Sequence, residues 1–182
     1  MQRGGGSSTV ERAAVVEWAR RAVNLAVPSI RLALPADAEH IAAMSRDYVE
    51  AGLSWSWTAA RVMRSIGDRA SNVAVVADGD AILGFGIMQY GDHTAHLALL
   101  AVHPEHRSKG LGTRLMGWLE KPAVAAGIVR IRLEARADNP LAIEFYRRRG
   151  FEPHGRIAGY YQGRIDAVRL GKSLGPALSD LD

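Results

Sequence analysis

The chain has 182 residues, 48% of them hydrophobic, with 23 Lys and Arg against 19 Asp and Glu. This length suits one domain whose core needs no covalent staples. The absence of cysteine excludes disulfides, cysteine-ligated metals and a cysteine acyl-enzyme. No apolar run approaches the roughly 18 residues of a membrane span, and no apolar signal core precedes the domain, so we expect a cytoplasmic protein. The net charge of +4 favours a polyanionic partner, either nucleic acid or a multiply phosphorylated small molecule.

Residues 1–28 are predicted to lie outside the domain. The first eight are rich in glycine and serine, which is typical of a flexible arm. Apolar residues then recur at helical spacing over about residues 9–25, and Ser8 with Glu11 has the spacing of a capping box. We expect this helix to pack either on its own chain or on a partner subunit. In the second case the protein would be a homodimer.

The domain itself is predicted over residues 29–174, followed by a tail at 175–182. Strand patterns occupy residues 30–34, 73–77, 81–90, 95–102, 128–135, 151–157 and 165–170, and helix patterns about 37–53, 58–66, 110–126 and 140–149. Val124 and Leu141 are placed on the apolar faces of the last two helices. The order βααβββαβαββ predicts an α/β fold: a mixed, mostly antiparallel twisted sheet of about seven strands, flanked by about four helices.

A basic, glycine-containing loop is expected between the strand at 95–102 and the helix that follows it. Arg107, Gly110 and Gly112 form the pattern Arg-x-x-Gly-x-Gly. Glycine lets the backbone turn sharply and approach a ligand closely. A helix beginning there presents unpaired N–H groups and the positive end of its dipole. The stretch therefore predicts a phosphate or pyrophosphate site, to which Lys109 adds charge.

Two common phosphate-binding patterns do not fit. The Rossmann fingerprint requires a third glycine where Leu115 stands. The segment 171–173 resembles the end of a P-loop, but Asp166 occupies the position of the required upstream glycine.

The loop instead resembles the coenzyme A loop of the GNAT superfamily of N-acetyltransferases, whose pattern is Gln/Arg-x-x-Gly-x-Gly/Ala after the fourth strand. A second stretch, residues 133–151, closely resembles the strand-five and helix-four region of protein N-terminal acetyltransferases. The order of elements over residues 29–174 is also that of the family. The resemblance implies a GNAT fold and acetyl-coenzyme A as co-substrate. Because the chain has no cysteine, we expect direct attack by a primary amine in a ternary complex.

The resemblance also implies a set of cofactor-binding residues. The pyrophosphate would bind chiefly to backbone N–H groups of Arg107, Ser108, Lys109, Gly110, Leu111 and Gly112. Leu100 and Val102 match strand positions whose backbone pairs with the pantetheine arm. Asn139 matches an asparagine that contacts this arm or caps the following helix.

Two catalytic residues follow from the same comparison. Tyr146 matches the family tyrosine taken as general acid, and Glu134 matches a glutamate proposed as general base. A buried core tyrosine and a strand glutamate paired with Arg132 or Arg136 are the alternative interpretations. For Glu134 the sequence does not decide between a general base and a structural partner of Arg132 or Arg136.

Aromatic pairs mark the predicted acceptor pocket: Trp55 and Trp57 before the second helix, and Tyr160 and Tyr161 near the last two strands. Clustered aromatics suit an amphipathic or aromatic amine, although core packing or a dimer contact would also explain them. No metal is predicted, because the histidines at 93, 96, 103 and 106 show no ligand spacing and are expected at the surface.

The acceptor itself stays open between a protein N terminus or lysine and a small-molecule amine. Glu134 with Tyr146 favours the protein class, whereas the aromatic pairs favour small molecules. A non-catalytic acyl-coenzyme A-binding regulatory module is the alternative function. Nucleic acid is disfavoured, because no nucleic-acid-binding module is recognised and much of the positive charge lies at the loop.

Overall fold

The computed structural model describes residues 28–175, so the predicted N-terminal helix and residues 176–182 lie outside it. The order of elements confirms the predicted βααβββαβαββ arrangement. The elements are β1 (Ser29–Leu32), α2 (Ala38–Tyr48), α3 (Ala59–Gly67), β2 (Ser71–Asp78), β3 (Ala81–Tyr90), β4 (Thr94–Val102), α4 (Leu111–Ala125), β5 (Arg130–Arg136), α5 (Pro140–Arg147), β6 (Glu152–Tyr161) and β7 (Ile165–Ser173), with short 3-10 helices η1 (Pro35–Asp37) and η2 (Pro104–His106).

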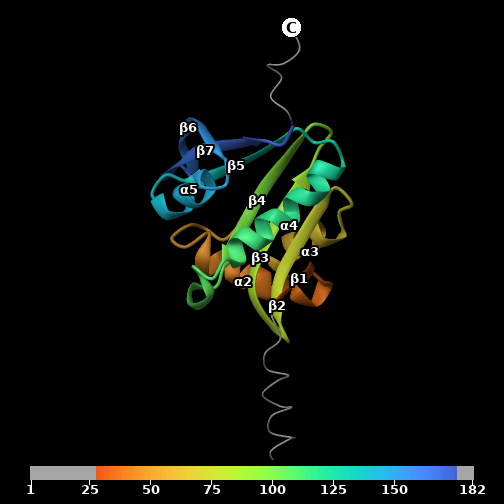
Figure 1. The fold of residues 1–182 in the computed structure, drawn as a ribbon. Coiled ribbons are helices and arrows are strands. Elements are labelled where there is room, and N and C mark those ends of the chain that lie inside the picture. Colours follow the sequence, from red (N-terminus) through yellow and green to blue (C-terminus); the bar gives the residue numbers. More distant parts are fainter. Residues whose placement is uncertain (1–27, 176–182) are drawn as a thin grey trace, which may run out of the picture.

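The seven strands form one sheet in the order β1-β2-β3-β4-β5-β7-β6. Neighbouring strands are antiparallel except β4 and β5, which are parallel. Helix α4 lies across one face, and α2 and α3 lie behind the sheet on the other (Figure 1). The predicted mixed, mostly antiparallel sheet with helices on both faces is confirmed.

The parallel pairing of β4 with β5 is very short. It runs only from Thr94 opposite Arg130 to His96 opposite Arg132. Beyond these residues β4 continues along β3 as far as Val102, and β5 continues along β7 as far as Arg136. The two strands therefore diverge, and the sheet separates into halves, β1 to β4 and β5 to β7, that remain joined at one end (Figure 1).

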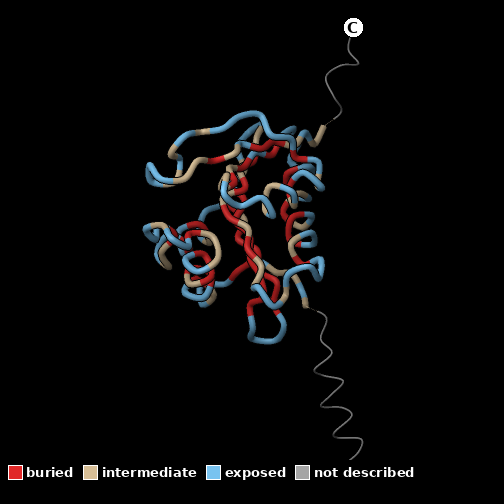
Figure 2. The backbone as a smooth tube through the Cα atoms, turned by 90° about the vertical axis from the view of Figure 1, so that its left-hand side faces the viewer, coloured by how far each residue is buried: buried red, intermediate tan, exposed pale blue. Residues whose placement is uncertain are grey.

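Two apolar clusters hold the layers together, and buried residues follow the sheet between the exposed helix faces (Figure 2). One cluster joins the sheet to α4 and α5 through Leu111, Leu115, Met116, Leu119, Ala123 and Tyr146. The other joins it to α2 and α3 through residues that include Ile41, Met44 and Val62. Full burial of such side chains contributes about 1.5–3 kcal/mol each.

A β-bulge in β4 changes which residues face which cluster. Ile87 pairs with Leu99 and the next residue, Met88, pairs with Leu97, so Ala98 has no partner on β3. Before the bulge, Leu97 packs in the α4 cluster, and after it Leu99 packs in the α2 and α3 cluster. In a regular strand residues two apart share a face. The bulge therefore re-aims the second half of β4.

The helix starts follow the sequence, but some predicted boundaries and buried positions are wrong. Thr58 and Asn139 accept hydrogen bonds from the backbone N–H groups of Arg61 and Ala142 and so cap α3 and α5. Helix α2 ends at Tyr48 rather than near residue 53, and Gly52, with a φ of 79°, lies in the turn that follows it. Val124 and Leu141 are 57% and 83% exposed. Each lies five residues, or about 140° of helical rotation, from a buried residue of its helix.

No helix among the described residues is both long and apolar enough to cross a membrane.

Two glycines allow a matched test of the packing between the sheet and α4. A Cβ on Gly86 would lie 2.7 Å from Cδ1 of Leu119, which is fully buried, and 3.1 Å from Cδ1 of Leu100. Gly86→Ala should lower the free energy of unfolding by about 1–3 kcal/mol. Gly117→Ala on α4 meets nothing within 4 Å and should raise it by about 0.5–1 kcal/mol. Urea unfolding measures both changes, and equal effects of the two substitutions would contradict this account of the packing.

Candidate active site

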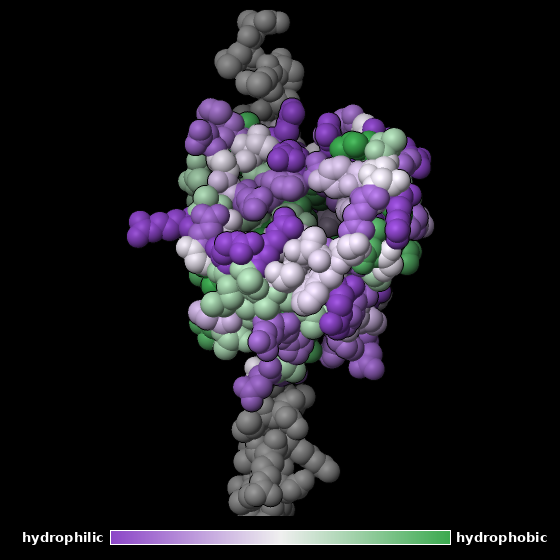
Figure 3. Space-filling view, turned by 180° about the vertical axis from the view of Figure 1, so that it is seen from behind, coloured by the Kyte–Doolittle hydropathy of each residue, from purple (hydrophilic) through white to green (hydrophobic). Residues whose placement is uncertain are grey.

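A cavity of about 660 Å³ opens where β4 and β5 diverge. Its walls are the α2–α3 loop, residues 96–100 of β4, residues 133–136 of β5, the start of α5 and the end of β6. From the side of α2 and α3, hydrophilic side chains surround a hollow with some hydrophobic surface inside it (Figure 3). Such a concave site with a few polar groups is the usual form of a small-ligand site.

The predicted phosphate loop has the geometry of an anion site. Ser108 and Gly110 take left-handed conformations, with φ of 60° and 77°. Helix α4 begins at Leu111, and no side chain of the described residues caps it at Gly110. The N–H groups of its first turn therefore have no partner within the helix and lie beside an exposed, basic loop. The backbone of residues 107–112 fits the pyrophosphate role expected of it.

Arg107 is tied to β4 as well as being charged. Its Nε donates to the carbonyl oxygen of Val102 at 3.1 Å, and its guanidinium lies 5.9 Å from the ring centroid of Tyr48. Leu100 lines the cavity, on the part of β4 beyond its pairing with β5. The backbone edge of β4 is thus accessible at Leu100, while the carbonyl of Val102 is already engaged.

The first turn of α4 is held against α5 by a close contact. A Cβ on Gly112 would lie 3.1 Å from the ring of Phe145, so a larger residue there would press on this ring. The guanidinium of Arg149 stacks on the Phe145 ring, 3.6 Å from its centroid. Arg149 also donates hydrogen bonds to the carbonyl of Phe145 and to the hydroxyl of Thr113. Burial lowers the pKa of Arg149. Arg147 and Arg148 are exposed, whereas Arg149 connects α5 to α4 through its contacts with Phe145 and Thr113.

Tyr146 lies in the wall of the cavity. Its ring is buried between Phe145 and Phe151, in edge-on contacts with centroid distances of 5.2 and 5.7 Å. Burial, and then the neighbouring Tyr161, raise the pKa of the Tyr146 phenol well above its ordinary range. The hydroxyl therefore keeps its proton and is available as a hydrogen-bond donor.

Glu134 also lines the cavity, and its side chain is only 6% exposed. Its carboxylate lies 2.8 Å from Nε2 of His96 and 3.3 Å from Nη1 of Arg132. Nε of Arg169 is 3.8 Å away. The expected pairing with Arg132 is present, whereas Arg136 binds Asp138 instead.

His96 was expected at the surface, and this expectation is wrong. It is the last residue of β4 paired with β5, and its side chain lines the cavity. Because an ionised carboxylate only accepts, the bond to Glu134 requires His96 to carry its proton on Nε2. In the neutral imidazole the lone pair is then on Nδ1, which has no hydrogen-bond partner among the described residues.

Three of the four predicted acceptor aromatics line the cavity: Trp57, Tyr160 and Tyr161. Trp57 is buried beneath the guanidinium of Arg61, 4.0 Å from the ring centroid. Tyr161 donates to the backbone oxygen of Glu134 at 3.0 Å. Trp55 does not line the cavity, because its indole N–H turns back to the carbonyl of Trp57. Asn139 lines the cavity while also capping α5.

The contacts that hold the α2–α3 loop over the cavity were not predicted from the sequence. Glu50 is buried and accepts hydrogen bonds from the backbone N–H groups of Ser56 and Trp57 at 2.8 and 3.1 Å, and from two serine hydroxyls. The amide side chain of Gln162 forms two bonds, of 2.8 and 2.7 Å, with the backbone of Ser54. Since Gln162 and Ser54 are 108 residues apart, no local sequence pattern predicts this contact.

Comparisons with known proteins agree with this geometry. The profile described as "Acetyltransferase (GNAT) family" matches residues 39–151. The ribosomal protein bS18-alanine N-acetyltransferase of Salmonella typhimurium is 32% identical over 118 residues, which are 63% of this chain and 79% of that protein.

Solved structures show the same fold at lower identity. The ribosomal-protein-S18-alanine N-acetyltransferase from Escherichia coli has a TM-score of 0.72 and 23% identity, covering 86% of this chain and 99% of that one. Ard1 from Thermoplasma volcanium has a TM-score of 0.70 and 24% identity, covering 81% and 98%.

The buried carboxylate of Glu50 can be tested by its effect on stability. Glu50→Ala leaves the buried backbone N–H of Trp57 and the partly buried N–H of Ser56 without their acceptor, so the free energy of unfolding should fall by about 1–3 kcal/mol. Glu152→Ala removes an exposed carboxylate and should change it by less than about 0.5 kcal/mol. Urea unfolding measures both, and a similar small change in the two variants would show that Glu50 does not hold the loop.

Proposed function

Since this chain belongs to the acetyltransferase (GNAT) family and is an acetyl-coenzyme A-dependent acyltransferase, we propose that its acceptor is the α-amino group of a protein N terminus. The 32% identical relative is named for acetylating the alanine of a ribosomal protein, which supports this acceptor class. One observation carries the proposal: Tyr146 and the His96–Glu134 pair line one cavity at the divergence of β4 and β5.

The proposed binding of acetyl-coenzyme A uses backbone groups. The N–H groups of residues 107–112 would hold the pyrophosphate, supported by the charge of Arg107 and Lys109. The unpaired edge of β4 at Leu100, and Asn139 at the start of α5, would position the pantetheine arm. In this arrangement the thioester, which supplies the activated acetyl group, lies in the gap between the two strands.

The two sides of the gap suit different proton transfers. Tyr146 comes from the α4 and α5 side of the sheet, and its neutral phenol would donate a proton to the departing thiolate. On β5 the buried residues Ile131, Leu133 and Ala135 alternate with Glu134, which therefore points to the opposite side. The acceptor amine would approach from there.

The proton of that amine would be taken by His96, with Glu134 as its positioning partner. Glu134 already accepts hydrogen bonds from His96 and Arg132, so both of its carboxylate oxygens are engaged. His96 offers the free Nδ1 lone pair. The carboxylate would fix the imidazole orientation and stabilise its protonated form, as in other carboxylate–histidine pairs.

The walls of the cavity suit an acceptor that continues beyond the reacting amine. Tyr160, Asp138 and Asn139 line the cavity and are exposed, so it opens to solvent along this rim. A protein N terminus would enter there, past the β5–α5 loop and the end of β6. The aromatic ring of Trp57 also favours a second candidate, an aromatic small-molecule amine, which the acceptor test separates from the first.

The acceptor class can be tested with a peptide series. We expect thiol release from acetyl-coenzyme A with peptides that carry a free α-amine, and none with the same peptides when that amine is blocked. A blocked peptide with an internal lysine, a polyamine and an aromatic amine serve as the competing acceptors. A higher kcat/KM for any of these three would overturn the proposed acceptor, while calorimetric binding of acetyl-coenzyme A would still support the family function.

The roles of His96 and Glu134 can be separated by substitution. His96→Ala should lower kcat about 100-fold, the lower end of what a general base contributes, and added imidazole should restore part of it. Glu134→Gln keeps a partner for His96 and should lower kcat less. Neither change should alter the affinity for acetyl-coenzyme A.

His93→Gln, at an exposed histidine in the β3–β4 turn, is the control and should behave as the wild type. The assignment is wrong if Glu134→Gln abolishes turnover while His96→Ala retains it, because the carboxylate would then be the base itself.

A further inference from the structure

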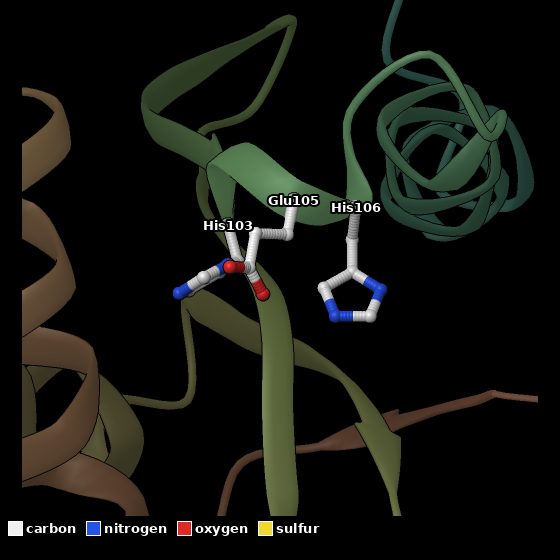
Figure 4. A group of neighbouring side chains, drawn as sticks. All are labelled: His103, Glu105 and His106. Atoms are coloured by element: carbon white, nitrogen blue, oxygen red, sulfur yellow. The ribbon is translucent and has the colours of Figure 1, made fainter.

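Three side chains converge beside the phosphate loop without taking part in the proposed reaction. They are His103, Glu105 and His106, and their potential ligand atoms all lie within 4.8 Å of one another. Glu105 points between the two imidazole rings (Figure 4). The sequence assigned these histidines to the surface and predicted no metal.

The local backbone explains why the three meet. Residues 104–106 form the 3-10 helix η2, which has three residues per turn, so side chains three apart lie above one another. His106 N–H donates to the carbonyl of His103 at 2.9 Å, and Pro104 fixes the first helical φ. The two imidazole rings are 5.8 Å apart between centroids.

One ring nitrogen in the cluster is buried without a hydrogen-bond partner in the described part of the chain. Nδ1 of His103 is buried and makes no hydrogen bond in the described part of the chain. The ring is held by an edge-on contact with Tyr48, with centroids 5.6 Å apart. A buried polar atom without a partner is costly, so a ligand for this nitrogen would be stabilising.

We propose that His103, Glu105 and His106 bind a divalent transition-metal ion of the Zn²⁺ class. Two imidazoles and one carboxylate are a known donor set for zinc, and imidazole nitrogen selects against Mg²⁺ and Ca²⁺, which prefer oxygen. Donor atoms around tetrahedral zinc are roughly 3.4 Å apart, a spacing that requires rotation of the exposed Glu105 side chain and of the partly exposed His106 ring. The fourth position is open to water.

The charges near the three ligands affect the affinity of the site for a cation. Glu105 supplies the one negative charge, while Arg107 and Lys109 follow it in the chain and oppose a cation. The guanidinium of Arg107 is directed toward Val102 and Tyr48. Because Arg107 follows His106 directly, a bound ion would fix the start of the phosphate loop, and its charge would add to that of the loop.

The test uses the untagged full-length chain and competition for Zn²⁺ with a chromophoric chelator. We expect one ion per chain in the wild type. Glu105→Gln and His106→Gln should each weaken binding at least about 10-fold, since loss of even an outer-shell partner costs this much. Both residues lie at or near the surface, and circular dichroism will verify that the variants fold.

Two further measurements locate the ion. His40→Gln and His93→Gln remove exposed histidines elsewhere and should leave the affinity unchanged. Side-chain ¹⁵N spectra should show Zn²⁺-dependent shifts of His103 and His106 only. Absence of binding by the wild type, equal binding by the Glu105 and His106 variants, or shifts confined to His96 would each overturn the proposal. None of these readouts depends on acetyl transfer, so the metal site and the proposed function fail independently.

Discussion

The site depends on the separation of two parallel strands. β4 and β5 are paired over only three residues on each strand, yet each continues along its other neighbour. Along the rest of β4, the backbone N–H and C=O groups that would bond a parallel neighbour therefore face a cavity instead. A polar backbone edge beside an apolar wall is what an amide-containing ligand arm requires. The same divergence joins the two faces of the sheet, which a continuous sheet would keep apart.

The bulge at Ala98 gives the two faces different chemistry. Before it, His96 lies on the opposite side of the sheet from Leu97, which packs under α4. On β5, Glu134 points to the same side as His96, and the two side chains meet at 2.8 Å. Tyr146 belongs to the cluster under α4 and α5. The proposed proton acceptor and the proposed proton donor thus lie on opposite sides of the gap.

Polar contacts across long sequence distances complete the cavity. Within the α2–α3 loop the carboxylate of Glu50 binds the backbone of Ser56 and Trp57, and Gln162 ties the loop to the β6–β7 hairpin. Arg136 adds a bond from β5 to the carbonyl of Ala51 at 2.7 Å. Because these bonds join three separate segments, loop and hairpin positions are coupled. Loops fixed in this way combine a defined wall with an open rim.

The sequence by itself determined what depends on neighbours along the chain. Periodicity identified every strand and α-helix of the described residues, although not the two 3-10 helices. Thr58 and Asn139 marked helix starts, and Arg107 to Gly112 marked the loop for which we propose phosphate binding, because caps and turns are local. Only the tertiary structure decided the partner of Glu134, the burial of Arg149, the exposure of Leu141 and the convergence of His103 with His106. These depend on strand register, a bulge that reverses side-chain parity, and the angle at which helices meet the sheet, none of which a one-dimensional pattern specifies.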